Sequence, residues 1–143
     1  MNKSWYYNGG MSTINSFRVR DISDIPLQYL MFLDSLEYHV ETEGFIIVHA
    51  GLNFEIDDPF SDKHAMLWAR NGNVVPELIN HRKVVHGHTP MVLDKIKEQL
   101  DHDTTAYDLD NGCVYSGVEG LGNLCALELN SLKLEVQPNV DLF

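Results

Sequence analysis

Cysteine and long apolar runs are scarce in this chain of 143 residues. The two cysteines, Cys113 and Cys125, predict neither a disulfide framework nor a zinc knuckle, because such scaffolds use several closely spaced cysteines. No apolar run approaches the roughly 20 residues of a membrane-spanning helix. Residues 1–10 contain no apolar region typical of a signal peptide. These absences favour a cytoplasmic protein with reduced thiols and exclude a membrane partner.

Positive charge is also in short supply. The chain has 10 Lys and Arg residues against 21 Asp and Glu residues, which gives a formal net charge of -11. A nucleic-acid backbone is bound by Lys and Arg side chains that replace its counterions, and no basic stripe is present here. We therefore expect no nucleic-acid partner. An acidic chain can still bind phosphate where metal ions supply the positive charge.

The remaining composition is that of a globular protein, with 44% hydrophobic and 22% charged residues. The length suits one domain with a core of its own. We place this domain at residues 1–137 and a short tail at 138–143.

Hydrophobic patterning predicts a fold of mixed α and β class. Leucines at helical spacing follow Pro26 and predict a helix in a region that ends at Gly44. The other expected elements are short helices at 12–17, 66–68 and 76–82, a polar stretch at 94–103, buried strands at 45–48 and 84–85, an apolar strand near 113–115, and a hairpin with a two-residue turn at 124–136.

Two segments share one design, in which a buried strand is followed by a histidine beside small residues. The first is VHAG at 48–51 and the second is VHGHT at 85–89. A neutral imidazole is a good ligand for divalent metals, and a strand end holds it rigidly. If the strands are neighbours, His49 and His88 can share one ion. A lone histidine after a strand is more often a structural residue, so the spacing alone leaves both interpretations open.

Several segments together resemble the calcineurin-like metallophosphoesterases, the phosphoprotein phosphatase family, and within it the bacterial serine/threonine protein phosphatases. FIIVHAGL at 45–52 resembles their His-Ala-Gly motif, and HGHTP at 86–90 resembles their Gly-His-Thr motif, in the same order and separation. The further similar segments are MLWAR at 66–70, LDNGCVY at 109–115, residues 122–129 and residues 5–16.

The resemblance implies a fold, a chemistry and roles for particular residues. The fold is the C-terminal half of a calcineurin-like β-sandwich flanked by helices. The cofactors are divalent metal ions, Mn²⁺ first, with iron or Zn²⁺ as alternatives, and His49 and His88 are ligands of the second ion. Arg70 clamps the phosphate oxygens of a phosphoprotein or a small phosphoester. His86 and Asp110 support the site without binding metal.

The motifs that open this family, G-D-x-H-G, G-D-x-x-D-R-G and G-N-H-E, do not occur in the chain. By resemblance they supply the remaining metal ligands, the general acid and two further arginines. The sequence therefore predicts an incomplete, C-terminal part of a metallophosphoesterase that needs its N-terminal half, and little activity for the chain alone.

Competing functions remain open on the sequence alone. The first is hydrolysis of phosphoserine or phosphothreonine in proteins, and the second is hydrolysis of symmetrical diadenosine tetraphosphate in the same fold. The third is a fragment or binding module without catalysis. Two other features have structural rather than functional explanations. Asp57, Asp58 and Asp62 fit a solvated acidic loop better than a cation site, and Cys113 fits packing better than nucleophilic catalysis.

Overall fold

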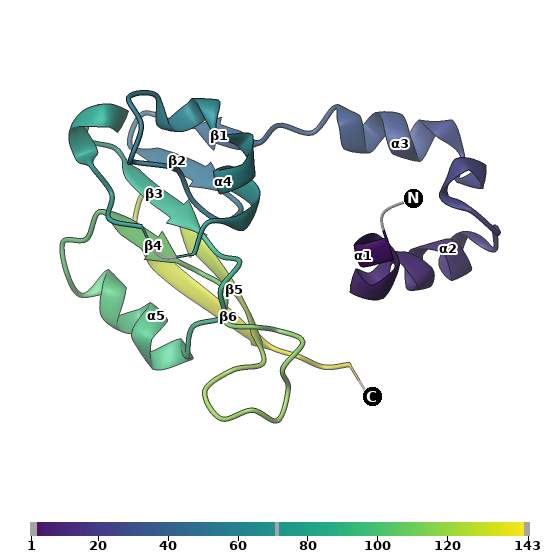
Figure 1. Cartoon of the computed structure of the whole chain (residues 1–143). Coiled ribbons are helices and arrows are strands. Elements are labelled where there is room, and N and C mark those ends of the chain that lie inside the picture. Colours follow the sequence, from purple (N-terminus) through teal and green to yellow (C-terminus); the bar gives the residue numbers. More distant parts are fainter. Residues whose placement is uncertain (1–2, 71, 142–143) are drawn as a thin grey trace. The chain divides into compact units, whose positions relative to one another are not determined.

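The computed structural model describes residues 3–70 and 72–141 (Figure 1). The chain divides into two compact units, Met1–Glu37 and Tyr38–Phe143. The single domain expected over 1–137 spans both of them, and that assignment stays a prediction.

The described part of the first unit contains only helical elements. They are α1 (Lys3–Trp5), η1 (Tyr6–Gly10), α2 (Met11–Phe17), η2 (Ile22–Asp24) and α3 (Leu27–Asp34). The expected helix at 12–17 is α2, which begins one residue earlier, at Met11 after Gly10. Ile14 and Ile25 are buried, whereas α3 buries none of its own residues.

The second unit is built on a four-stranded sheet of order β1-β2-β3-β4. Its strands are β1 (His39–Glu41), β2 (Phe45–Val48), β3 (Lys83–His86) and β4 (Ala106–Asp108). β1 is antiparallel to β2, and the other neighbours are parallel. The connections carry η3 (Pro59–Ser61), α4 (Lys63–Trp68) and η4 (Pro76–Ile79) before β3, and α5 (Leu93–Leu100) after it.

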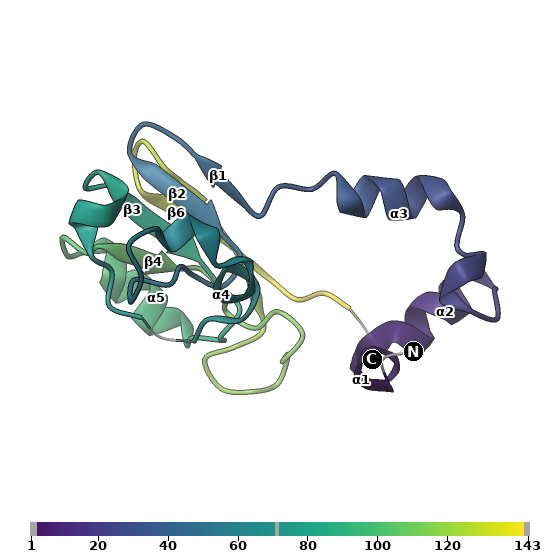
Figure 2. The same ribbon diagram turned by 45° about the horizontal axis from the view of Figure 1, so that its top comes forward.

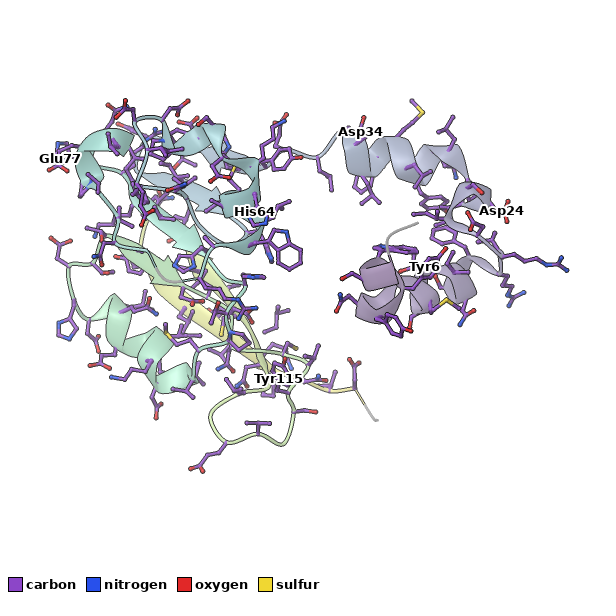
Figure 3. All side chains as sticks on the ribbon, in the orientation of Figure 1. Tyr6, Asp24, Asp34, His64, Glu77 and Tyr115 are labelled. Atoms are coloured by element: carbon purple, nitrogen blue, oxygen red, sulfur yellow. The ribbon has the colours of Figure 1, made fainter. Side chains whose placement is uncertain are left out.

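One face of the sheet is covered by the helical connections. Ile46 of β2 and Val84 of β3 form a core cluster with Met66 of α4 and Ile79 of η4. Ile46 has 0% exposure, because it lies mid-strand with Val84 beside it in the parallel register. His64 of α4 and Glu77 of η4, labelled in Figure 3, are exposed on the outside of this layer.

A second, two-stranded sheet lies on the other face. It is the antiparallel hairpin β5 (Asn123–Glu128) and β6 (Lys133–Pro138). Its turn residues Leu129 and Leu132 line a pocket with Phe45 and Tyr107, which face away from the helical side. Figure 2 shows the yellow hairpin behind the blue strand β2. The unit is therefore a mixed α/β structure with helices on one side and a hairpin on the other.

The polar stretch at 94–103 is largely the helix α5, to which the sequence analysis assigned no secondary structure. Leu93, Ile96 and Leu100 recur at helical spacing in α5, and Ile96 is fully buried. The charged residues between these positions make the short apolar pattern hard to recognise in the sequence.

The end of the chain also differs from expectation. Residues 113–115 form a turn rather than a strand, since the extended chain of β4 ends at Asp108 and Gly112 takes a left-handed φ of 58°. The hairpin turn spans four residues, 129–132, instead of two. Pro138 belongs to β6, and the Asn139 N–H donates to the Gly122 carbonyl at 2.8 Å, so the tail begins later than 138.

Among the helices of residues 3–70 and 72–141, none has the length and apolar character needed to cross a membrane.

Ile46→Ala should lower the free energy of unfolding by about 2–5 kcal/mol, because it leaves a cavity between the sheet and α4. Urea unfolding followed by circular dichroism measures the change. Leu124→Ala is the matched control, since Leu124 is 62% exposed and should cost under about 1 kcal/mol. Equal losses for the two variants would contradict the packing of the sheet against α4.

Candidate functional site

Two histidines meet at the carboxyl edge of the parallel strands. β2 ends at Val48 and β3 at His86, so His49 directly follows one strand and His88 closely follows the next. The Gly87 N–H donates to the His49 carbonyl at 2.9 Å and ties the strand ends together. Because neighbouring parallel strands end at the same edge, two side chains 39 positions apart become neighbours.

The two imidazoles are in direct contact. His49 Nε2 lies 3.1 Å from His88 Nδ1, and the ring centroids are 4.9 Å apart. The indole of Trp68, at the end of α4, packs edge-on against His88 with the centroids 5.6 Å apart. The structure thus brings together the two histidines that the sequence pattern singled out, and their role as metal ligands stays a prediction.

The separation of these nitrogens suits two ligands of one ion. Nitrogen ligands at the usual ~2.0–2.1 Å from a tetrahedral ion are about 3.3 Å apart, close to the observed 3.1 Å. Within residues 3–70 and 72–141, however, no three His, Cys, Asp or Glu side chains are arranged to hold a metal ion. The described residues therefore offer two candidate ligands and no complete metal site.

His88 has one nitrogen that finds no partner. With Nδ1 facing His49, its Nε2 is buried, and no described residue forms a hydrogen bond with it. If Nδ1 binds a metal, Nε2 carries the proton, and a ligating histidine normally donates that N–H to an acceptor. A buried unpaired donor costs about 1–3 kcal/mol. The described residues thus leave one buried nitrogen of His88 without a partner.

The surroundings of His88 favour its neutral form. Burial lowers the pKa of His88, and the nearby His49 and Arg70 lower it further, against an opposing effect of Asp110. Neutral imidazole is the form that binds metal ions. His88 also takes a left-handed backbone φ of 74°, a strained conformation for a residue with a side chain.

Arg70 is exposed and lies close enough to His88 to affect its charge. It forms no ion pair with any other described residue. Its side chain lines an open cleft of about 850 Å³ on the helical side of the sheet. The Arg70 guanidinium, which pairs with no acid among the described residues, is available for an anion such as phosphate.

His86 and Asp110 lie near the histidine pair without joining it. His86 Nδ1 is 3.3 Å from the Gly87 carbonyl, and the residue is half-buried at the cleft. Asp110 Oδ1 accepts from the Gly112 N–H at 2.8 Å, which shapes the turn after β4. Gly87 allows a close approach here, because a Cβ at that position would stand 3.1 Å from the Asp110 Cβ.

Two buried polar residues were not predicted from the sequence. Asn111 is 1% exposed and makes four hydrogen bonds. Its Nδ2 donates to the carbonyls of Met91 and Gly120, and its Oδ1 accepts from the main chain and side chain of Asn123. It anchors the loop that carries His88 to the start of β5. Asp108 is 5% exposed, at the end of β4. The sequence could have pointed to Asp108 only if strand β4 had been predicted.

The acidic loop has a structural role. Asp58 and Asp62 accept hydrogen bonds from main-chain N–H groups at the starts of η3 and α4, at 3.1 and 3.0 Å. Asn53 also donates to Asp62 at 2.9 Å. These contacts account for the two carboxylates without a cation.

Comparison of the chain with models of protein families, with functionally characterised proteins and with solved structures found no match to any of them.

Asn111→Ala should destabilise the second unit by about 2–4 kcal/mol, because it leaves the Met91 carbonyl and the Asn123 N–H without partners and removes one of the two hydrogen bonds to the Gly120 carbonyl. Urea unfolding provides the measurement. Asn130→Ala, at the exposed hairpin turn, is the control and should change stability by less than about 0.5 kcal/mol. A similarly small effect at Asn111 would show that the loop is held by other contacts.

Asp108→Asn should change the pH dependence of stability. Burial raises the pKa of Asp108, so the folded state holds this proton more tightly than the unfolded state. Its stabilising contribution is complete below the unfolded pKa of about 3.9 and is lost as pH rises through the folded pKa. Unfolding free energies at several pH values between 4 and 7 should therefore shift in favour of the variant as pH rises.

The amide in this variant can still accept the Asp110 N–H, which donates to Asp108 Oδ1 at 2.9 Å. The exposed Asp101→Asn gives the matched loss of one charge. If the difference between Asp108→Asn and the parent protein is the same at every pH, burial does not govern the titration of Asp108.

Proposed function

We propose that this chain is part of a calcineurin-like metallophosphatase that hydrolyses phosphate monoesters of serine or threonine in proteins. The observation that carries the proposal is the 3.1 Å approach of His49 Nε2 to His88 Nδ1, with the unpaired Arg70 nearby. The resemblance of 45–52 and 86–90 to the two histidine motifs of that family supports the same function.

Each of the three side chains has a role that its surroundings support. His49 and His88 hold a divalent ion, Mn²⁺ first and iron or Zn²⁺ as alternatives, through nitrogens on rigid strand ends. Arg70 binds phosphate oxygens with its planar guanidinium and orients the ester. The bound metal supplies Lewis-acid chemistry and lowers the pKa of a bound water. These cations also offset the formal net charge of -11, which otherwise repels a phosphoester.

The described residues supply too few ligands for catalysis by themselves. A divalent ion in a protein takes four or more ligands, and only two are arranged here. His88 Nε2 also lacks its acceptor among them. We propose that another polypeptide segment supplies the missing ligands and that acceptor, so the chain alone binds metal weakly and hydrolyses little.

His49→Ala and His88→Ala should each weaken binding of Mn²⁺ to the chain by at least about tenfold. Titration followed by the electron paramagnetic resonance of free Mn²⁺ measures the affinity. His81→Ala, an exposed histidine away from the pair, is the control and should bind like the parent. Equal affinity in all four proteins would exclude the histidine pair as a metal site.

Phosphatase activity is then measured on p-nitrophenyl phosphate with Mn²⁺. The chain of 143 residues should show little turnover, and a version extended upstream in its own gene should be active and lose activity in His49→Ala. Turnover by the short chain that depends on His49 would show that its site is complete. An inactive extended form that still binds Mn²⁺ would refute the phosphatase proposal itself.

A further inference from the structure

The cleft beside Arg70 has features that the histidine pair and Arg70 leave unexplained. It measures about 850 Å³ and is open to solvent. Its polar and aromatic lining includes Phe54, Glu55, Arg70, His86, Gln99 and Asp108. His86 lines both this cleft and the depression that holds His49 and His88, so the cleft and the histidine pair adjoin. A phosphoester held by Arg70 therefore has this cleft available for the group attached to its phosphate.

Asp108 is a buried acid at this cleft, and His86 is the basic group that acts on it electrostatically. It is 5% exposed, and its Oδ1 accepts a hydrogen bond from the Asp110 N–H. No Lys or Arg among the described residues forms an ion pair with it. His86 stands beside it in the parallel register of β3 and β4. A buried carboxyl without a cation is costly, so such a position is a candidate for ligand recognition.

The backbone around Asp108 is already fixed. Gln99 of α5 accepts the Asp108 N–H at 2.9 Å, and its amide lies 3.3 Å from the Asp108 carbonyl. The main-chain groups of Asp108 are thus satisfied within the protein, and the carboxyl group is left with capacity for a further donor. The two hydrogen bonds with Gln99 thus hold the Asp108 carboxyl in place at the cleft before a ligand binds.

The balance of charge in the cleft favours a cation. Its ionisable lining groups are Glu55, Arg70, His86 and Asp108. Once Arg70 faces a phosphate, the two carboxyl groups and the imidazole remain. A positively charged group entering the cleft would pair with acids that form no ion pair with the described residues.

We propose that the cleft is a specificity subsite for a Lys or Arg side chain close to the phosphorylated residue of a peptide substrate, with Asp108 and Glu55 as its acidic partners. This inference rests on the proposed phosphatase function and names its substrate class. A volume of about 850 Å³ corresponds to a linear dimension of roughly 9 Å, which an extended peptide spans in about three residues. The basic residue therefore lies within about three positions of the phosphoserine or phosphothreonine.

Direct binding tests this without requiring catalysis. The ¹⁵N-labelled chain is titrated with short phosphoserine peptides that carry Arg at one position within three residues of the phosphate, and with matched peptides that carry Gln there. The Arg peptides should bind about three- to tenfold more tightly and should shift the amide signals of Asp108 and Asp110. In Asp108→Asn the ratio of the affinities for the Arg and Gln peptides should fall to near one. Asp101→Asn should keep the ratio of the parent protein.

Glu55→Gln provides a second variant, because Glu55 is exposed and its loss does not threaten folding. It should reduce the Arg preference in part. Retention of the full preference in both Asp108→Asn and Glu55→Gln would overturn the subsite, as would the absence of binding up to roughly 10 mM peptide. A nucleoside phosphate that shifts the cleft signals when the peptides do not would assign the cleft to a nucleoside, and would equally overturn the proposal.

The unphosphorylated forms of the same peptides separate this inference from the proposed function. If the phosphate strengthens binding but Arg and Gln peptides bind alike, the subsite is wrong and the phosphate site stands. If the Arg preference depends on Asp108 but the phosphate adds nothing, the acidic subsite stands and Arg70 does not bind the phosphate in this chain.

Discussion

The parallel pairing of β2 with β3 is the contact on which the candidate site depends. The register places Ile46 beside Val84, and both are buried under the helical connections. That packing fixes the two strand ends at one edge, and the Gly87 N–H bond to His49 completes the alignment. If the strands slipped by one residue, their side chains would exchange faces and the histidines would separate. Apolar packing in the core therefore fixes the distance between the His49 and His88 side chains at the edge of the sheet.

Beyond the ends of the strands, hydrogen bonds hold the loops in place. The loops after β3 and β4 leave Val92, Val114 and Val118 exposed, and Asn111 joins the loops through hydrogen bonds to Met91, Gly120 and Asn123. These groups are satisfied inside the protein. His88 Nε2 and Thr89 Oγ1, by contrast, are buried and have no hydrogen-bond partner among the described residues. The loop around Asn111 is therefore satisfied by its own hydrogen bonds, whereas the segment at His88 and Thr89 is not.

Charged side chains lie both at the histidine pair and at the neighbouring cleft. An acidic chain repels phosphate unless cations gather locally, and Arg70 beside the histidine pair offers a place where they can. Asp108 and Glu55 border the same cleft, so an anion and a cation on one substrate would meet opposite partners. A phosphopeptide with a basic side chain has this arrangement of charge.

The sequence by itself determined the buried strands, the mixed α/β class and the choice of His49 and His88, because continuous β-branched runs and strand-end histidines are local patterns. It missed α5 and β4, whose apolar residues are too few to stand out from their polar neighbours. Only the tertiary structure decided that Asp108 is buried at a cleft and that the two histidines touch. Burial and distance depend on which distant segments pack together, and local spacing does not encode that.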